Sequence, residues 1–332
     1  NATHDVSLTA VSLGGGGSRS EDVDDEDERL ALEVGGVEVA LAVAVGRGHR
    51  HEHLRTDRLT FERLLEAGHD LEWEHFQIES AAKRFEEFNL QEISDWMDLG
   101  FIAKKLRHVC LVLSHQAVFK RNYNFGLLDQ ILPYVERENL TRHPAIGLYY
   151  HAGRFLSDPA AEDHFFAFRQ MLFQYAEAFP GDELRALYLL AINFGVKKNN
   201  MAPNQAWDRA NFDLYKEALA RDLLLDKGQL SHFSYNNIVI AAMRLGETAW
   251  AEEFIHQYKP HLERKYREST FNMNMARLAY LQKDYHAALL HLQRADYRDF
   301  IHSMNAKTLQ MKIYFDTGET DLLESHLDSM QH

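Results

Sequence analysis

Three stretches near the end of the chain share one pattern, which constrains the fold more than any other feature of the sequence. Each stretch holds a turn residue, and successive turn residues are 37 and 35 residues apart. An apolar helical run precedes each turn, an apolar residue follows it five positions later, and a larger apolar residue comes four positions after that. The turn residues are Gly246, Lys283 and Gly318, and the apolar positions are Ala251, Ala288 and Leu323, then Ile255, Leu292 and Leu327. The pattern predicts a helix–turn–helix unit that repeats about every 35 residues.

Alanines stand in the middle copy where a core would usually take larger side chains. Ala276 and Ala279 lie on its expected first helix, and Ala288 lies on its second. The two helices of a hairpin approach closely only if small residues stand where they cross, so these alanines indicate a tight crossing. A unit of this kind buries one face internally and another against its neighbour, and it therefore needs several copies to be stable.

The copy at Asn272–Ala295 resembles a tetratricopeptide repeat. Its Ala276, Tyr285, Ala288, Leu292 and Ala295 match the small–aromatic–small–large–small pattern of that family. It departs from the family at Asn272, where Trp is favoured, and at Phe300, where Pro is favoured. The flanking copies match more loosely, because Leu323 replaces the usual Ala and Thr248 the usual Tyr. The resemblance covers about 100 C-terminal residues. It implies an all-α fold, an α-solenoid of antiparallel helical hairpins wound into a right-handed superhelix.

Further helical pairs are expected upstream, where no clean motif marks them. The expected helices are 62–88, Ser94–Phe119, Leu127–Arg137, Pro144–Leu156, Glu162–Phe179, Glu183–Gly195 and Ala206–Leu225, which gives about six hairpins over the chain. Asn193–Trp207 is expected to be a long polar loop that binds a ligand or simply bridges two helices. Gly228 suits the left-handed residue past a helix end, and Ser231 suits the N-cap of the next helix. Related solenoid repeats and an irregular globular helical domain remain alternatives.

Residues 1–58 differ sharply from the rest of the chain. Residues 2–60 use only ten residue types, and the stretch Glu21–Glu28 has seven acidic residues among its eight. Such a composition supplies no normal packed core, and its like charges repel one another. We therefore expect residues 1–58 to be a disordered or weakly ordered low-complexity segment, or not to be authentic coding sequence. The helical-repeat domain is expected to span residues 59–332.

Charge and composition exclude several classes of protein. The chain carries 50 acidic and 36 basic residues, a net charge of −14, whereas a general nucleic-acid binder usually has a basic surplus. The most apolar stretch, Leu30–Val45, is too short and too polar to cross a membrane. A single cysteine, Cys110, excludes an intramolecular disulfide and suits a reducing compartment. We therefore expect a cytoplasmic protein with neither a nucleic-acid nor a membrane partner.

Few residues carry a pattern that suggests catalysis or metal binding. His49, His51 and His53 would face one way on an extended strand, but the sequence offers no second pair of ligands. The glycine run Gly14–Gly17 lacks the Gly-Lys-Ser/Thr of a phosphate loop, and no nucleophile elbow or dinucleotide fingerprint is present. We therefore expect no metal and no cofactor, and a protein that is not an enzyme.

The resemblance implies that the first helices of the C-terminal hairpins line a concave groove. Their polar residues, which are the candidate binding residues, are Asn236, Asn237, Arg244, Asn274, Arg277, Asn305 and Lys312. An asparagine amide can pair with an extended peptide backbone, and a cation can hold a carboxylate. The alternative is that these are solvated faces and hydrogen bonds between repeats.

We therefore expect a non-enzymatic interaction scaffold that binds a protein or peptide in this groove. One alternative is an enzyme or regulatory domain whose site assembles only in space. Another is a self-associating structural subunit, which would show an apolar outer face on the last helix, Leu322–Met330. The oligomeric state does not follow from the sequence.

Overall fold

The protein is described by a computed structural model over residues 61–82, 88–294 and 300–330. Within these ranges the chain forms thirteen α-helices, and its regular strands are two of two residues each. The prediction of an all-α fold is therefore confirmed. The low-complexity segment 1–58, with its three alternating histidines, lies outside the described residues.

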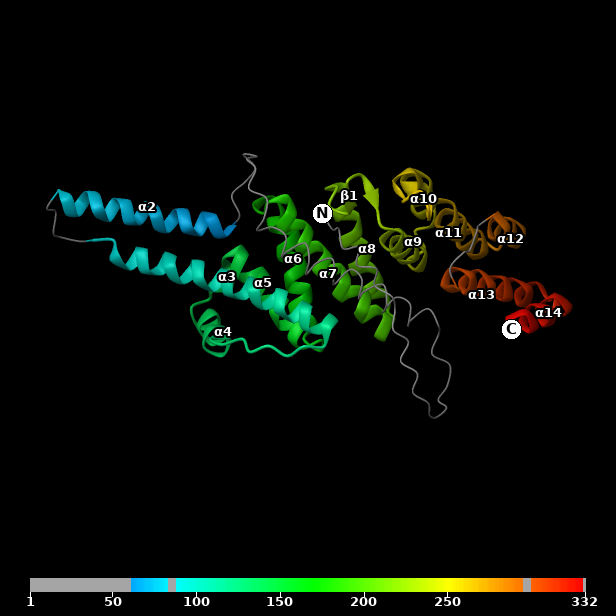
Figure 1. Cartoon of the computed structure of the whole chain (residues 1–332), viewed down its shortest axis with the longest axis horizontal. Coiled ribbons are helices and arrows are strands. Elements are labelled where there is room, and N and C mark those ends of the chain that lie inside the picture. The colour runs from blue at the N-terminus through cyan, green and yellow to red at the C-terminus, as the bar shows by residue number, and fades with distance from the viewer. Residues whose placement is uncertain (1–60, 83–87, 295–299, 331–332) are drawn as a thin grey trace, which may run out of the picture.

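The first seven helices and the last six are joined by a short β-hairpin (Figure 1). The first group is α2 (Phe61–Ala81), α3 (Leu90–Phe119), α4 (Leu128–Arg137), α5 (Pro144–Ser157), α6 (Glu162–Tyr175), α7 (Gly181–Met201) and α8 (Gln205–Ala220). The hairpin pairs β1 (Leu225–Asp226) with β2 (Gln229–Leu230). The second group is α9 (His232–Arg244), α10 (Thr248–Tyr258), α11 (Arg267–Leu281), α12 (Tyr285–Arg294), α13 (Phe300–Thr317) and α14 (Thr320–Met330). Short 3-10 turns lie at Leu140–Arg142, Ala176–Ala178 and Lys259–His261.

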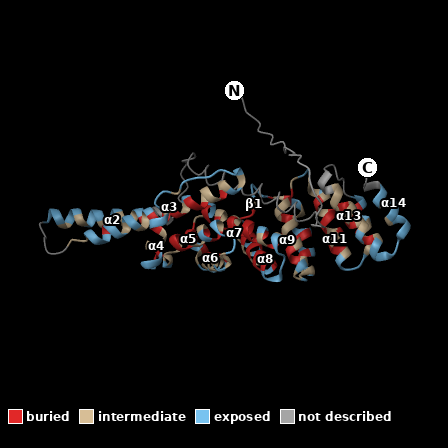
Figure 2. Cartoon of the chain, turned by 90° about the horizontal axis from the view of Figure 1, so that it is seen from below, coloured by how far each residue is buried: buried red, intermediate tan, exposed pale blue. Residues whose placement is uncertain are grey.

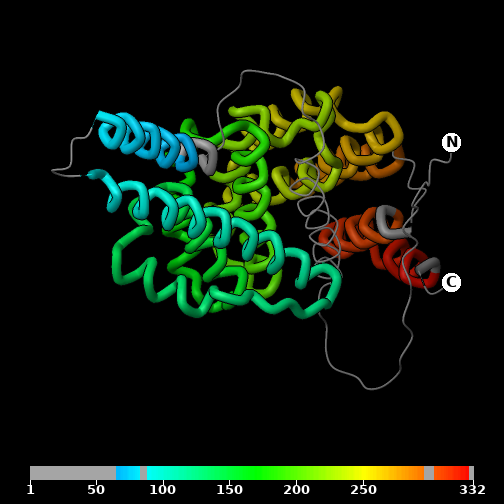
Figure 3. Tube along the Cα trace, turned by 60° about the vertical axis from the view of Figure 1, so that its left-hand side comes forward, coloured from blue at the N-terminus to red at the C-terminus, as the bar shows by residue number. Residues whose placement is uncertain are grey.

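The helices lie in space in nearly the order in which they follow along the chain (Figures 1 and 3). Contacts join α7 to α8, α8 to α9, α9 to α10 and α11, and α11 to α12. The α13–α14 pair lies at the C-terminal end of the row. At the other end, α2 packs along α3, which in turn packs on α5. Buried residues gather on α5, α7, α8, α9 and α11, while α2 is largely exposed (Figure 2).

The three repeated turns have the same backbone conformation. Gly246, Lys283 and Gly318 are left-handed, with φ of 76°, 63° and 73°. In each turn the following residue donates its N–H to the carbonyl five positions back, and the turn residue itself donates to the carbonyl three positions back. This is the Schellman motif, which satisfies carbonyls at a helix end that would otherwise lack donors. The shared spacing in the sequence therefore marks a shared structural device.

The alanines of the middle hairpin lie where its helices cross. Ala276 and Ala288 are fully buried, Ala279 is nearly so, and they belong to one apolar cluster with Leu292 and Ile313. Because a methyl group occupies little depth, α11 and α12 pack closely along their length. This small cluster is separate from the larger core that runs from α2 to α11, and α11 contributes residues to both.

Two local expectations are corrected by the structure. The segment Asn193–Trp207 is not a long loop, since α7 continues to Met201 and α8 begins at Gln205. Asn204 caps α8 by accepting a hydrogen bond of 3.1 Å from the Trp207 backbone N–H. Side-chain bonds of this kind offset the poor helix propensity of asparagine, which had suggested a loop.

The second correction concerns Gly228, which lies in the β-hairpin rather than past a helix end. Lys227 and Gly228 have φ of 52° and 79°, and two successive left-handed residues form the turn that suits a two-residue hairpin. Ser231 is the N-cap of α9, as expected, and its hydroxyl accepts from the Phe233 N–H at 3.2 Å.

Candidate functional site

A polar pocket lies where the α7–α8 hairpin meets α9. We call it the amide pocket, and its walls are Val196, Asn199, Asn200, Asp208, Asn211, Tyr215, Asn237, Ile240, Ala241 and Arg244. It is open to solvent, and its accessible space is small, about 20 Å³, which is room for about one water molecule. Two of the candidate binding residues, Asn237 and Arg244, therefore lie in one site with residues that the sequence analysis did not select.

One wall of the amide pocket is an ion pair with a supporting amide. The Asp208 carboxylate accepts a hydrogen bond of 2.7 Å from Asn199 Nδ2, and both side chains are buried. Arg244 Nη1 lies 3.7 Å from the same carboxylate oxygen, Oδ1. The carboxylate thus has a cation and an amide donor beside it, and the charged groups of the pocket neutralise one another.

Three carboxamides in the amide pocket have polar atoms without a hydrogen-bond partner among the described residues. These atoms are Asn200 Nδ2, Asn211 Oδ1 and Asn237 Oδ1, all of which are buried. A buried polar atom without a partner costs about 1–3 kcal/mol, and native structures contain few of them. Their concentration in one pocket indicates that a partner from outside the chain, either water or a ligand group, satisfies them.

Gly195 explains how Asn211 fits against α7. A Cβ added at Gly195 would lie 2.0 Å from Asn211 Oδ1, so only glycine leaves room for this carboxamide. Asn211 is 4% exposed, which fixes its side chain between the two helices of the hairpin. Gly195 thus leaves space for the Asn211 carboxamide, although the oxygen of that carboxamide makes no hydrogen bond within the described residues.

Asn236, Asn274 and Arg277 form a separate contact between α9 and α11. Asn274 Nδ2 donates to Asn236 Oδ1 at 2.6 Å and to the Thr270 carbonyl at 2.9 Å. Its own Oδ1 accepts from Arg277 Nη1 at 3.5 Å. Asn274 is completely buried, so in the structure it serves the contact between neighbouring hairpins. A direct role of these three residues in binding stays a prediction.

The two remaining candidates lie on α13. Asn305 is half-buried and Lys312 is exposed, and neither lines the amide pocket. The structure therefore brings together two of the seven candidates in the pocket and three in the α9–α11 contact.

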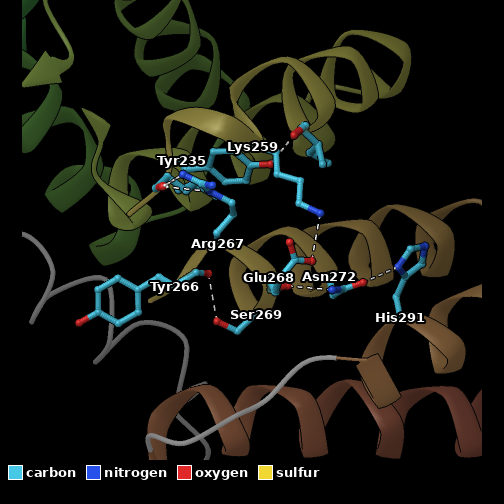
Figure 4. A network of polar contacts seen from close by, with 10 residues as sticks. Tyr235, Lys259, Tyr266, Arg267, Glu268, Ser269, Asn272 and His291 are labelled. Atoms are coloured by element: carbon cyan, nitrogen blue, oxygen red, sulfur yellow. Dashed lines mark hydrogen bonds and ion pairs between the residues drawn. The ribbon is translucent and has the colours of Figure 1, made fainter. Parts of the chain in front are cut away.

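A second polar network, shown in Figure 4, joins the α9–α10 hairpin to the α11–α12 hairpin. Asn272 donates to the Glu268 carbonyl at 2.8 Å and lies 2.9 Å from Nδ1 of His291 on α12. Lys259 pairs with the Glu268 carboxylate at 3.0 Å. Asn272 stands where the tetratricopeptide family, which this copy resembles in sequence, favours Trp, and here its amide makes hydrogen bonds. Because its named polar groups have partners, this network is structural.

A buried titratable group lies between α3, α5 and α7. The Tyr149 hydroxyl donates to Glu183 Oε1 at 2.6 Å, and Arg107 Nε lies 4.0 Å from the same oxygen. Burial and the neighbouring Glu183 carboxylate raise the pKa of Tyr149 well above its usual value. Burial raises the pKa of the Cys110 thiol too, so this cysteine is a poor nucleophile. None of these residues lines the amide pocket.

His151 and His164 form a second titratable pair. Their Nδ1 atoms are 2.8 Å apart, so one ring donates and the other accepts. Burial, followed by the proximity of His164, lowers the pKa of His151 to about 4. Among the described residues no group of three or more His, Cys, Asp and Glu side chains is arranged to hold a metal ion.

The pocket residues that the sequence analysis missed carry one signal. The dipeptide Asn-Asn at Asn199–Asn200 recurs 37 residues later at Asn236–Asn237, the same spacing as the first two repeated turns. Asn211 carries no such signal, because it lies on the second helix of its hairpin.

No family model, no curated protein and no solved structure matches the chain. No helix in the described ranges combines the length and the apolar character that crossing a bilayer requires.

Proposed function

We propose that this protein is a cytoplasmic, non-enzymatic scaffold that binds an extended segment of a protein partner. The proposal places the helical hairpins in a tetratricopeptide-like solenoid with a right-handed superhelical twist. The segment would lie along the first helices of the C-terminal hairpins and pass over the amide pocket. The three repeated Schellman turns and the contacts between successive hairpins support this architecture.

The observation that carries the proposal is the set of carboxamides without partners in the amide pocket. Asn200, Asn211 and Asn237 come from three different helices and line one small pocket, where each has a buried polar atom without a partner. An extended peptide presents N–H and C=O groups along its length, and each asparagine amide can both donate and accept. Asn200 and Asn237 are half-buried, so a segment that crosses the pocket would reach their amides once these two side chains rotate toward it.

The positions of the ionisable groups support a scaffold rather than an enzyme. Acid–base catalysis needs titratable groups with adjusted pKa values inside the site that holds the substrate. The residues with large pKa shifts, Tyr149 and His151 among them, do not line the amide pocket. The pocket instead offers amides and a neutralised ion pair, which suit recognition.

A peptide-display selection against the full chain tests the proposal. We expect it to yield peptides whose affinity falls about 5- to 100-fold when Asn237 is replaced by Ala, since a lost hydrogen bond to a buried group costs about 1–3 kcal/mol. Asn122→Ala is the matched control, because Asn122 is exposed on the α3–α4 loop. Fluorescence anisotropy with the selected peptides gives the affinities. Peptides that bind both variants equally well would place binding elsewhere and contradict the proposal.

A self-associating structural subunit is the second candidate, and the last helices favour it. Leu322 and Leu327 on α14 are 50% and 41% exposed, and Phe315 on α13 is 73% exposed. Apolar surface at the end of a helical row can cover the end of another copy. Sedimentation analysis of the full chain tests this, and Leu322→Lys should shift any dimer toward monomer. A monomer at all concentrations would dismiss this candidate.

A further inference from the structure

We propose that one face of the α2–α3 hairpin is a docking surface for a basic amphipathic helix of a partner protein. We call the part of this hairpin formed by Phe61–Ala81 and residues 90–101 the arm. It projects from the N-terminal end of the row of helices (Figures 1 and 2). The inference goes beyond the proposed function, because the arm contributes no residue to the amide pocket and lies at the other end of the row from the C-terminal hairpins.

The two helices of the arm are held together from within. A Cβ added at Gly68 would lie 2.8 Å from the Trp96 ring, so the indole packs directly on the backbone of α2. Asn89 Nδ2 donates to the Glu72 carbonyl at 2.8 Å and to the Glu72 carboxylate at 2.6 Å, which ties the start of α3 to α2. The arm is therefore a preformed hairpin, joined through residues other than its exposed apolar ones.

Large apolar side chains are exposed on the outside of the arm. The exposed fractions are 45% for Trp73, 53% for Leu90, 59% for Met97 and 51% for Phe101. Aromatic residues and methionine are enriched in the buried centres of protein interfaces. Several such side chains gathered on one surface mark an interaction site more strongly than single exposed residues do.

The Glu66–Lys104 ion pair shows that these side chains share one face. It joins α2 to α3, so it marks the sides of the two helices that face the same way. Trp73 follows Glu66 by seven residues, and Phe101 and Met97 precede Lys104 by three and seven. Spacings of three, four and seven keep side chains on one side of a helix. Because the helices are antiparallel, Trp73 and Met97 each lie two turns from the ion pair toward the tip of the arm.

Leu90 continues the same face, since it precedes Met97 by seven residues. We call the surface formed by Trp73, Leu90, Met97 and Phe101 the arm face. Its α3 residues extend over about 16 Å of helix, at a rise of about 1.5 Å per residue. An apolar stripe of that length along two antiparallel helices fits a third helix of three or more turns, which would bury its own apolar side there.

The charge of the arm selects a basic partner. The arm carries nine acidic residues and one basic residue, Arg63. Asp70 and Asp98 are exposed and stand three residues before Trp73 and Phe101, so carboxylates flank the arm face. Lysines and arginines beside the apolar stripe of a partner helix would lie near these carboxylates. A second copy of the arm would instead bring its own acidic residues to the face, and an anionic membrane surface would be repelled in the same way.

The test titrates a synthetic helical peptide into the full chain. The peptide has leucines at the a and d positions of each heptad and mostly lysines elsewhere. One control peptide has glutamates in place of the lysines, and a second has the same composition with its leucines scattered around the helix. Calorimetry gives the affinities. The emission of Trp73, obtained by comparison with Trp73→Phe, reports whether the arm face itself becomes covered.

We expect the basic amphipathic peptide to bind and to shift the emission of Trp73 to shorter wavelength. Met97→Ser and Phe101→Ser should each weaken binding about tenfold or more, because each removes a large apolar side chain that the complex buries. Replacing Asp70 and Asp98 together by Asn should lower the affinity at low salt and flatten its salt dependence.

Leu71→Ser is the matched control and should leave the affinity unchanged. Leu71 is 67% exposed on the same helix, but it precedes Trp73 by two residues and so points about 160° away from it around α2. A thermal melt of each variant shows that it is folded.

The remaining outcomes overturn the proposal in different ways. Equal binding of either control peptide would show that the arm does not select a basic amphipathic helix. Equal weakening by Leu71→Ser and Phe101→Ser would show that the arm face is not the binding surface. A dimer of the full chain that Phe101→Ser breaks and Leu71→Ser does not would assign the face to a second copy. Binding to phosphatidylcholine–phosphatidylserine vesicles that Phe101→Ser abolishes would assign it to a membrane surface. No binding of the basic peptide at millimolar concentration would show that no such helix docks there.

Discussion

Replacing Asn274 or Asn237 by alanine should affect different properties, stability in the first case and binding in the second, although both residues lie on the expected groove helices. Asn274 is completely buried and makes three hydrogen bonds, to Asn236, the Thr270 carbonyl and Arg277. Asn237 has a buried oxygen without a partner. The first substitution should therefore lower the stability of the fold, and the second should lower binding.

The magnitudes follow from the contacts that each amide makes. Asn274→Ala removes two short hydrogen bonds, of 2.6 and 2.9 Å, each with a net contribution of about 0.5–1.5 kcal/mol. The third bond, from Arg277, is 3.5 Å long and adds little. The free energy of unfolding should fall by about 1–3 kcal/mol. Asn237→Ala removes a buried oxygen that has no partner, so the free energy of unfolding should stay the same or rise, by up to about 1–3 kcal/mol.

Urea unfolding of the full chain, followed by circular dichroism, measures both variants against Asn122→Ala. Hydrogen exchange at the amides of α9 and α11 localises the effect, because stability in a row of hairpins depends on contacts between neighbours. A loss of stability in the Asn237 variant as large as in the Asn274 variant would refute the reasoning. It would show that the Asn237 amide makes a structural bond and that the pocket is not a binding site of the kind proposed.

Three further predictions concern the turns, the histidine pair and the alanine crossing. Lys283→Gly should raise the free energy of unfolding and Gly246→Ala should lower it, each by about 0.5–2 kcal/mol, because only glycine adopts φ near +60° or +75° without strain. The melting temperature should move in the same direction. The pKa of His151 is lowered to about 4, so the folded protein favours the neutral imidazole. The free energy of unfolding therefore contains a contribution from this group that is complete above about pH 6.5 and is lost as pH falls toward 4. Acid titration of stability should show about 1–2 kcal/mol of this loss, allowing for the ring's partial exposure, and His151→Gln should remove it. Ala288→Leu should destabilise the α11–α12 hairpin by about 1–3 kcal/mol through overpacking, as measured by urea unfolding.

The type of secondary structure could be predicted from the sequence because the signals for it are local. Gly246 and Gly318 mark helix ends, since glycine adopts the left-handed conformation freely. Lys283 was placed in the same turn only by its spacing from them, and the structure gives it the same φ sign and the same pair of backbone bonds. Alignment of the copies thus compensated for an unfavourable residue type.

Boundaries that depend on tertiary contacts could not be predicted in this way. The asparagines near the end of α7 have low helix propensity, and the stretch was therefore expected to be a loop. Asn199 remains helical because Asp208 accepts its side-chain N–H across the hairpin. The two-residue strands at Leu225–Asp226 and Gln229–Leu230 are likewise too short for any periodic pattern to reveal.

The candidate site was predicted in part, for a similar physical reason. Asn237 and Arg244 lie on a first helix, where the family resemblance suggested a groove, and both line the amide pocket. Asn211 lies on a second helix and enters the pocket only because Gly195 leaves space for it. A residue whose position depends on a missing Cβ on another helix leaves no trace in local sequence spacing.

The two Asn-Asn pairs show how one short motif serves both the fold and the site. Successive residues on a helix point about 100° apart, so the two amides of a pair face different neighbours. The first amide of each pair makes the structural contact: Asn199 donates to Asp208, and Asn236 accepts from Asn274. The second, at Asn200 and at Asn237, lines the amide pocket and has a buried atom without a partner. Because the first asparagine fixes the helix against its neighbour, the second can be held in the pocket without forming a bond of its own.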